Sequence, residues 1–220
     1  MARAFLGVLM LQTRFPRVVG DVGNPASFAM PVRHQVVAGA SPQRVVREGD
    51  RTLLQPFIDA ARALVGEGAA AITTSCGFLV EVQAAMQAAL PVPVWTSALL
   101  KLPELAAPGV ITVDALSLGA RHLHAAGVDA TVPVVGLAAD SHLQRALLHD
   151  EPVIDAARAE ADVVDAAQRL VVRWPAVREI VLECTNMPPY AKAVARATRR
   201  PVHHIISLLH ERWRALRDNP

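Results

Sequence analysis

Short apolar runs alternate with helix-like segments along most of the chain. The runs that predict buried strands cover residues 4–11, 69–72, 92–95, 110–113, 132–137, 177–182 and 201–205, and a more polar strand is expected over 33–37. Apolar residues spaced three or four apart predict helices over 53–65, 78–89, 117–126, 153–172 and 207–217, and two more that begin near 142 and 188. Strands that alternate with helices of this length are typical of βαβ units and parallel sheets.

This pattern is present twice. We therefore predict an α/β protein of two pseudo-symmetric lobes, each a parallel-type sheet flanked by helices, with an active-site cleft between them. The first lobe is expected to span residues 1–104 and the second 105–206, and the final helix over 207–217 is placed to pack back on the first lobe.

The segment between the first two strands, residues 12–31, is rich in proline, glycine, asparagine and aspartate. A loop this long within a compact domain is more often functional than not. Arg14 offers a planar fork of donors for a substrate carboxylate, and Asn24 lies in the same loop. The alternative for both is a solvated turn, with Asn24-Pro25 marking the turn.

Composition limits the classes of function. Of 220 residues, 52% are hydrophobic and 19% charged, which is typical of a folded globular chain, and the formal charge of +2 gives no reason to expect a nucleic-acid or membrane partner. The apolar run 4–11 is too short to span a bilayer and no cleavage site directly follows it. We expect a cytoplasmic protein, compatible with a homo-oligomer, whose two cysteines are free thiols.

The two cysteines occupy equivalent positions. Cys76 follows the strand at 69–72 and precedes a predicted helix, and Cys184 follows the strand at 177–182 and precedes another. A thiol at a helix N-terminus faces unpaired backbone N–H groups, which favour the thiolate and attract a carboxylate. Because the cysteines lie about half the chain apart, we expect each lobe to contribute one to the cleft.

Two thiols that face each other across a small carboxylic acid can invert its α-carbon without a cofactor. One thiolate takes the α-proton and the opposite thiol delivers a proton to the other face. The candidate catalytic residues are therefore Cys76 and Cys184. The negative charge that develops on the carboxylate needs donors, and the candidate donors in the two turns are Thr74, Ser75, Gly77, Phe78, Thr185 and Asn186.

The position of Cys76, and above all the run Leu182-Glu183-Cys184-Thr185-Asn186-Met187-Pro188, resembles the cofactor-independent aspartate/glutamate/hydantoin racemase superfamily. The resemblance implies two domains that each contribute a cysteine, and a role for the pair as acid and base. The chain also departs from the pattern: many of the amino-acid racemases have Cys-Asn-Thr where this chain has Cys76-Gly77-Phe78. Asn186 stands where histidine or glutamate is frequent.

The expected function is therefore that of an isomerase, a racemase or epimerase of a small carboxylic acid such as aspartate, glutamate or a derivative. Three alternatives stay open: a one-cysteine decarboxylase or cis–trans isomerase on the same scaffold, a non-catalytic protein that binds small acids, and, weakest, a thiol redox protein. No cofactor is expected.

Histidines give no metal site in the sequence. His122 and His124 point to different faces of a predicted helix, and His203 and His204 to opposite faces of a strand, so neither pair chelates alone. His142, at a predicted strand-to-helix junction, is the histidine best placed to line the cleft, although a surface position is its ordinary alternative.

Overall fold

The computed structural model describes residues 4–218 and contains two four-stranded parallel sheets. The first sheet has the order β2-β1-β3-β4, formed by β1 (Phe5–Leu11), β2 (Val32–Val37), β3 (Ala69–Thr74) and β4 (Val94–Trp95). The second has the order β6-β5-β7-β8, formed by β5 (Pro108–Thr112), β6 (Val134–Gly136), β7 (Glu179–Leu182) and β8 (Val202–His204). Each sheet thus has the same connectivity, which confirms the predicted α/β fold of two pseudo-symmetric lobes.

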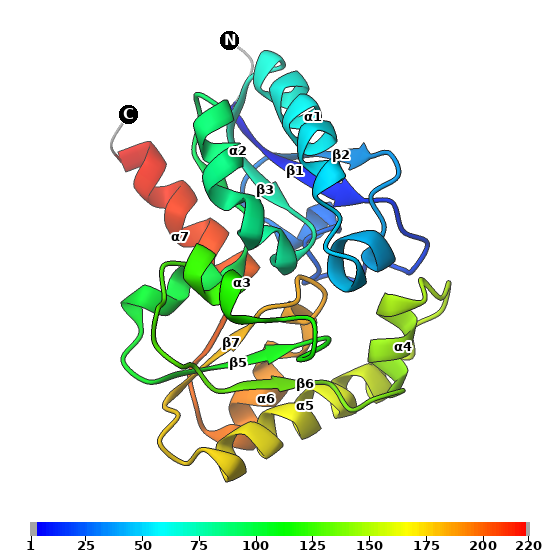
Figure 1. The fold of residues 1–220 in the computed structure, drawn as a ribbon, viewed down its shortest axis with the longest axis vertical. Coiled ribbons are helices and arrows are strands. Elements are labelled where there is room, and N and C mark those ends of the chain that lie inside the picture. Colours follow the sequence, from blue (N-terminus) through cyan, green and yellow to red (C-terminus); the bar gives the residue numbers. More distant parts are fainter. Residues whose placement is uncertain (1–3, 219–220) are drawn as a thin grey trace.

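Helices flank both sheets (Figure 1). Around the first sheet lie α1 (Leu54–Gly66) and α2 (Gln83–Ala89), and around the second lie α4 (His142–Leu148), α5 (Ala156–Arg173) and α6 (Ala191–Thr198). The short α3 (Ala120–Ala125) packs against residues 77–82 of the first lobe. The longest, α5, begins where the Asp155 side chain accepts hydrogen bonds from the N–H groups of Ala157 and Arg158, a standard N-cap.

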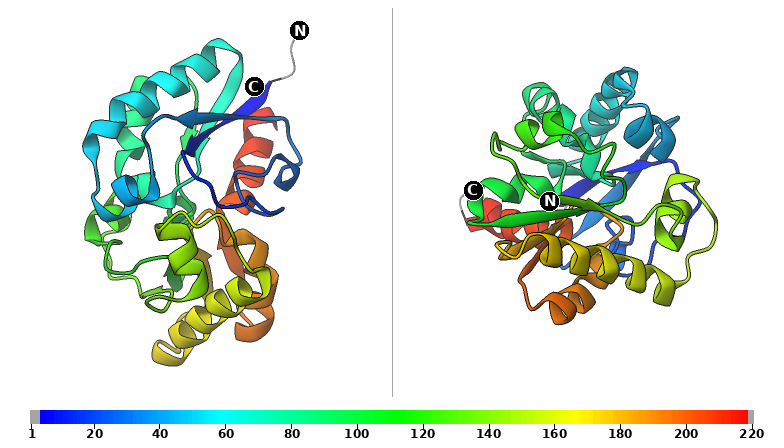
Figure 2. Two further views of the ribbon diagram at one scale, coloured as in Figure 1. Left: turned by 90° about the vertical axis from the view of Figure 1, so that its right-hand side faces the viewer. Right: turned by 60° about the horizontal axis from the view of Figure 1, so that its bottom comes forward.

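The last helix, α7 (Ile205–Asp218), follows β8 and runs beside the first lobe, where Figures 1 and 2 show it in red next to the first sheet. His210 Nε2 accepts a hydrogen bond from the Ala29 N–H (3.2 Å). Glu211 pairs with Lys101 (2.8 Å), which lies in the segment that connects the two sheets. The chain therefore crosses between the lobes a second time at its end.

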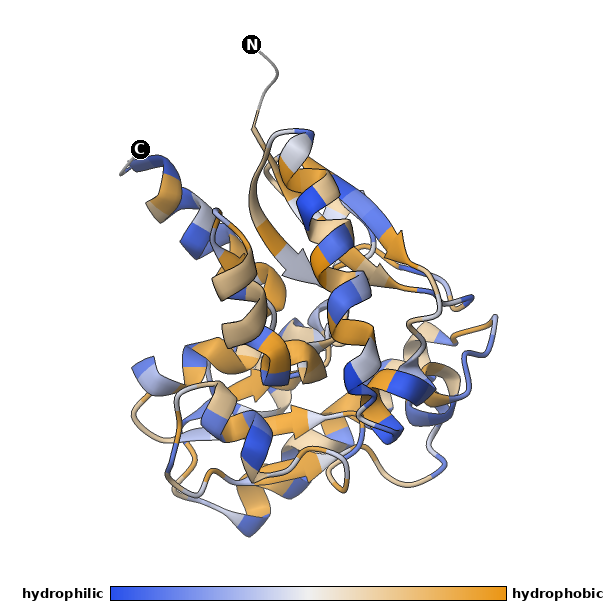
Figure 3. Cartoon of the chain, turned by 45° about the horizontal axis from the view of Figure 1, so that its top comes forward, coloured by the Kyte–Doolittle hydropathy of each residue, from blue (hydrophilic) through white to orange (hydrophobic). Residues whose placement is uncertain are grey.

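Apolar side chains fill the space between the sheets and their helices. Figure 3 colours each residue by its hydropathy, and much of the strands is coloured as hydrophobic. All seven residues of β1 are buried, because it is a central strand covered on both faces. The edge strand β2 carries Arg33, His34 and Gln35. Gly7 in β1 has no room for a Cβ beside Ile72 and Leu64, so α1 packs close to the sheet.

The helix predicted over 78–89 is divided. A 3₁₀ helix, Gly77–Val82, precedes α2. Cys76 is the N-cap residue and its side chain caps no backbone N–H, and the first turn is closed by the tighter bond from the Leu79 N–H to the Cys76 carbonyl (3.1 Å). The cysteine therefore sits at the start of a tight 3₁₀ turn.

Between residues 4 and 218, no helix is long and apolar enough to cross a membrane.

Candidate active site

The two cysteine turns meet at one small pocket between the lobes. One residue separates Cys76 from the end of β3, and one residue separates Cys184 from the end of β7. Each thiol therefore lies near the carboxyl end of the third strand in the spatial order of its sheet. The pocket has a volume of about 30 Å³. Both lobes line it, with Leu11, Phe15, Arg17, Pro42, Val46, Ser75, Cys76, Gly77, Phe78, Val113, Leu147, Leu148, Glu183, Cys184, Thr185 and Asn186.

Cys76 is a buried thiol with a strongly raised pKa. Burial, followed by the nearby Glu183 carboxyl, raises the pKa of Cys76 to about 12. The backbone N–H groups of Phe78 and Leu79 and the charge of Arg17 lower it, but by less. The N–H groups thus act in the direction expected from the sequence, while desolvation outweighs them and keeps the resting group a thiol.

A chain of polar side chains holds Cys184. Its Sγ–H donates to Asn186 Oδ1 (3.5 Å), and Asn186 Nδ2 donates to Asp21 Oδ2 (2.5 Å). Arg17 in turn pairs with Asp21 Oδ1 (3.2 Å). Because a carboxylate accepts only from the Nδ2 side of the amide, Asp21 turns Oδ1 of Asn186 toward the thiol.

Cys184 also stays protonated in this arrangement. Burial is the largest cause that raises its pKa well above the usual value, and Glu183, Cys76 and Asp21 add to it. The N–H of Asn186 opposes them. Both sulfurs are therefore thiols before a ligand enters.

Glu183 lies directly before Cys184 and is fully buried. Its Oε2 accepts a hydrogen bond from the Thr112 hydroxyl (2.8 Å), whereas Oε1 has no partner. Burial raises the pKa of Glu183 to about 8, and the Thr112 bond lowers it by less. A buried carboxyl group without a cation is kept neutral by its surroundings.

Comparison with known proteins shows which family this two-lobed chain belongs to. The chain is 30% identical to dimethylsulfoniopropionate lyase 7 of Emiliania huxleyi (strain CCMP1516), over 98% of this chain and 68% of that protein. It is 31% identical to a dimethylsulfoniopropionate lyase of Durusdinium sp. clade D, over 99% of this chain and 76% of that protein. The chain belongs to the family of these lyases.

Solved structures share the fold of this lyase family. Allantoin racemase from Klebsiella pneumoniae matches with a TM-score of 0.66 at 16% identity, covering 93% of this chain and 83% of that one. Unliganded arylmalonate decarboxylase matches with a TM-score of 0.60 at 19% identity, covering 90% and 86%. No protein-family model matches the chain. The two-lobed fold that the resemblance to the racemase superfamily implied is thus confirmed.

Five of the residues that sequence reasoning proposed for the substrate line this pocket, namely Ser75, Gly77, Phe78, Thr185 and Asn186. Two of their hydroxyls are already engaged: Ser75 Oγ accepts from the Leu11 N–H (2.8 Å), and Thr185 Oγ1 donates to the Ser75 carbonyl (2.6 Å). The second bond ties one lobe to the other at the pocket.

Thr74, Arg14 and Asn24 do not line the pocket. The Thr74 hydroxyl bonds to the Thr96 carbonyl (2.8 Å), and Asn24 caps a turn by accepting from Ala26 N–H (2.9 Å). Arg14 is 71% exposed and pairs with Asp150 (3.2 Å). These three residues have side chains that can donate hydrogen bonds to a carboxylate. The backbone, however, directs the side chains away from the pocket.

His142 is buried but also lies outside the pocket lining. Its Nε2 accepts a hydrogen bond from the Asp155 N–H (2.7 Å) at the start of α5. Between residues 4 and 218, no group of three or more histidine, cysteine, aspartate or glutamate side chains is placed to hold a metal ion.

Sequence reasoning missed Arg17, Asp21 and the acid Glu183. Arg17 and Asp21 are four residues apart and form an ion pair, a spacing visible in the sequence, and Glu183 adjoins the second cysteine. Nothing in the sequence, however, indicated that the three side chains turn inward.

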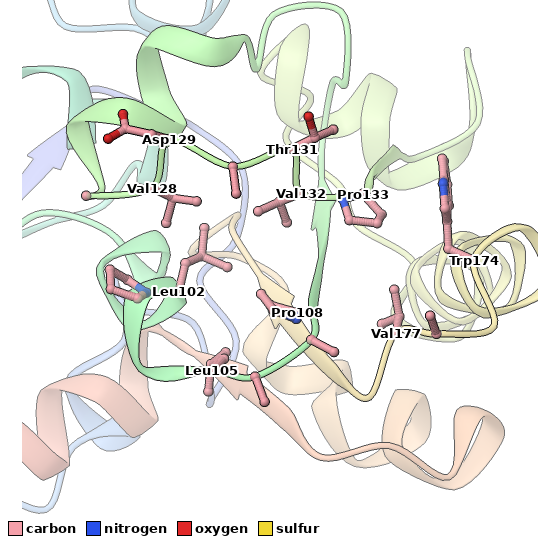
Figure 4. Close-up of a pocket in the computed structure, with 16 residues that line it drawn as sticks. Leu102, Leu105, Pro108, Val128, Asp129, Thr131, Val132, Pro133, Trp174 and Val177 are labelled. Carbon is pink, nitrogen blue, oxygen red and sulfur yellow. The ribbon is translucent and has the colours of Figure 1, made fainter.

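A larger hollow of about 550 Å³ lies at the other end of the second sheet (Figure 4). Its walls come from the amino ends of β5, β6 and β7 and include Leu102, Val128 and Trp174. Apart from Asp129 and Thr131, its lining is apolar, and it contains no thiol. The smaller pocket, which both thiols line, is therefore the better candidate for the active site.

Proposed function

We propose that this protein is a lyase that acts on dimethylsulfoniopropionate or a closely related sulfonium carboxylate. The observation that carries the proposal is the similarity, at 30–31% identity along nearly the whole chain, to two dimethylsulfoniopropionate lyases. It is supported by a pocket in which two thiols meet.

The proposed reaction is a β-elimination. Cys76, as thiolate, takes a proton from the carbon next to the carboxylate and becomes a thiol. The electron pair of that C–H bond forms the carbon–carbon double bond, and the bond from the β-carbon to sulfur breaks. Dimethyl sulfide leaves with the bonding pair, acrylate remains, and the proton on Cys76 returns to solvent.

We assign the base to Cys76 because its surroundings favour a thiolate more than those of Cys184. Arg17 and the N–H groups of Phe78 and Leu79 lower the pKa of Cys76. The Cys184 Sγ–H instead donates to Asn186, and Asp21 raises its pKa. Cys184 is therefore suited to keep its proton beside the carboxylate as negative charge develops there.

Both thiols are protonated at rest, and a sulfonium substrate would favour the ionisation of one of them. A positive charge within a few ångströms of a buried thiol favours its ionisation and lowers its pKa. The apolar walls formed by Val46, Phe78 and Leu148 suit the methyl groups on sulfur. Of the lining residues in the described part of the chain, only Arg17 is basic, and we assign the substrate carboxylate to it and to the N–H groups of the two cysteine turns.

Headspace measurement of dimethyl sulfide from purified protein and dimethylsulfoniopropionate tests the proposal. We expect release by the wild type and a loss of about a thousandfold or more in Cys76→Ser, because a serine hydroxyl is a far weaker acid than a thiol. Cys184→Ser should lose less. Full release by Cys76→Ser would overturn the assignment of the base.

A second candidate is the racemase or epimerase first expected, because two thiols from opposite lobes line one pocket. Its signature is exchange of the α-hydrogen with solvent in a carboxylic acid that is recovered intact. A one-cysteine decarboxylase would instead release carbon dioxide, and a binding protein would change no substrate.

A further inference from the structure

Glu183 is the buried ionisable group at this site that the proposed reaction leaves without a role. Its carboxyl group is fully buried, and its single hydrogen bond comes from Thr112 on β5 (2.8 Å). Oε1 is buried and has no partner among the described residues. A core that served only stability would gain by replacing such a group with an apolar one, so its presence indicates a functional use.

The unpartnered oxygen lies against the first cysteine turn. A Cβ added to Gly77 would collide with Glu183 Oε1 and with the Glu183 carbonyl oxygen. Gly77 directly follows Cys76, and Glu183 directly precedes Cys184. The carboxyl group therefore lies between the two cysteine turns, and Glu183 lines the same pocket as both thiols.

The surroundings also decide which oxygen carries the proton. Oε2 accepts the Thr112 hydrogen bond, so in the neutral acid the proton belongs on Oε1, the oxygen that faces the cysteine turn. A neutral carboxyl group there places no negative charge beside a thiolate. An ionised carboxylate there repels a thiolate, and its charge is among the causes that raise the pKa of both thiols.

We propose that Glu183 is a positioning residue of the active site: its buried carboxyl group, set against the two cysteine turns, permits a thiolate to form while it is neutral and opposes the thiolate once it is ionised. The proposal rests on the proposed function only in assuming that a thiolate is the base. In this proposal Glu183 acts through the cysteines.

Two other charged side chains, Arg17 and Asp21, lie near the cysteines. Arg17 and Asp21 pair with each other (3.2 Å); Arg17 acts on Cys76, and Asp21 on Cys184 and on the Tyr190 hydroxyl, whose pKa it raises. On β5 the neighbour is the neutral Thr112, and no charged side chain contributes to the shift of Glu183 itself. A change in the charge of Glu183 is therefore felt by the thiols without a compensating cation.

The test is a titration of the thiols without substrate, by thiolate absorbance in the ultraviolet and by the pH dependence of iodoacetamide alkylation. Glu183→Gln keeps the shape of the side chain and a donor but cannot ionise. We expect its thiols to titrate about one pH unit lower than those of the wild type, because a like charge has been removed. An unchanged titration would overturn the proposal.

Thr112→Val and Thr112→Ser provide a matched pair. Valine removes the hydrogen bond that favours the ionised carboxylate, so Glu183 stays neutral to higher pH and thiolate formation moves down in pH. Serine keeps the hydroxyl and should leave the titration unchanged. If valine and serine titrate alike, Glu183 has only a structural role.

Activity measurements separate this proposal from the proposed function. If no variant, wild type included, releases dimethyl sulfide but the thiol titrations shift as expected, the reaction is wrong and the role of Glu183 stands. If the wild type is active and Glu183→Gln has an unchanged thiol titration and rate–pH profile, the lyase stands and the role of Glu183 falls.

Discussion

At the scale of single residues, the site is governed by burial. Cys76 and Cys184 are each only 8% exposed, and Glu183 is inaccessible to solvent. Desolvation is the first cause of every raised pKa among the three, ahead of any neighbouring charge. The residues that would transfer protons are therefore uncharged in the resting site. A charged ligand would change their protonation more than a neutral one.

Glu183 makes stability depend on pH. Its folded pKa of about 8 lies above the ordinary value of 4.5, so the folded state binds this proton more tightly. The contribution is complete below about pH 4.5 and is lost as the pH rises through about 8. We expect Glu183→Gln, compared with the wild type by melting temperature, to gain stability between about pH 5 and pH 9.

The control is Glu67→Gln, which removes an exposed carboxylate that pairs with Arg33 (2.8 Å). It should show no such gain. A melting-temperature difference for Glu183→Gln that stays constant over this pH range would contradict the raised pKa of the buried carboxyl.

Gly77 should tolerate no larger side chain. Because Glu183 atoms occupy the position of a Cβ, Gly77→Ala must displace the cysteine turn or β7, at a cost of about 1–3 kcal/mol in the free energy of unfolding. Gly66→Ala is the control, since no atom lies within 4 Å of its Cβ position at the end of α1. Urea unfolding compares them, and equal stabilities would contradict the close approach of Glu183.

At the scale of elements, the pocket is too small for the proposed substrate. Its volume of about 30 Å³ leaves room for only about one or two water molecules. The long first loop contributes Phe15 to one wall, and α4 contributes Leu147 and Leu148 to the other. One of these elements has to move before dimethylsulfoniopropionate enters.

Arg14 and Asp150 join the two elements. Asp150 Oδ1 accepts from the Arg14 N–H (2.6 Å), and the Arg14 guanidinium pairs with Oδ2 (3.2 Å) and donates to the Asp150 carbonyl (3.1 Å). We expect Asp150→Ala to open the pocket more often, so that the KM for substrate and the rate of Cys76 alkylation both change by about three- to tenfold.

The pair Arg169–Asp165 on α5 offers a control, because it is a surface ion pair (2.8 Å) in residues that do not line the pocket. Asp165→Ala should leave KM and alkylation unchanged. Identical behaviour of the Asp150 and Asp165 variants would show that the loop and α4 do not gate access.

Much of the arrangement of strands, helices and loops could be predicted from the sequence. Apolar runs located most of the eight strands described between residues 4 and 218, because the central strands are buried, and the spacing of apolar residues located the helices. The long first loop was predicted to be functional, but Arg14 was chosen where Arg17 lines the pocket. Two arginines three residues apart in an irregular loop cannot be distinguished without the backbone directions.

The same limit applies to the thiols. Their positions after strands were predictable, because parallel strands bring their carboxyl ends to one edge. Their protonation was not, since desolvation depends on how tightly the lobes close, and the packing of Glu183 between the turns is a contact between distant segments. Local sequence around each cysteine indicated only the N–H groups, which are the weaker influence.

At the scale of the whole molecule, the site exists only where the two lobes join. Thr185 Oγ1 donates to the Ser75 carbonyl (2.6 Å), and Asn186 reaches Asp21 in the first lobe (2.5 Å). We expect Thr185→Val to lower the rate by about tenfold or more, with a loss of about 1 kcal/mol in stability, and Thr185→Ser to keep both. Equal rates for the two variants would contradict this role for the hydroxyl.

The central claim is that the joined lobes use Cys76 to eliminate dimethyl sulfide from a sulfonium carboxylate. Proton magnetic resonance of dimethylsulfoniopropionate with the protein in deuterated buffer tests it most directly. We expect acrylate and dimethyl sulfide to appear together, and neither to appear with Cys76→Ser. Intact substrate that accumulates deuterium at the α-carbon without release of dimethyl sulfide would contradict it and favour a racemase.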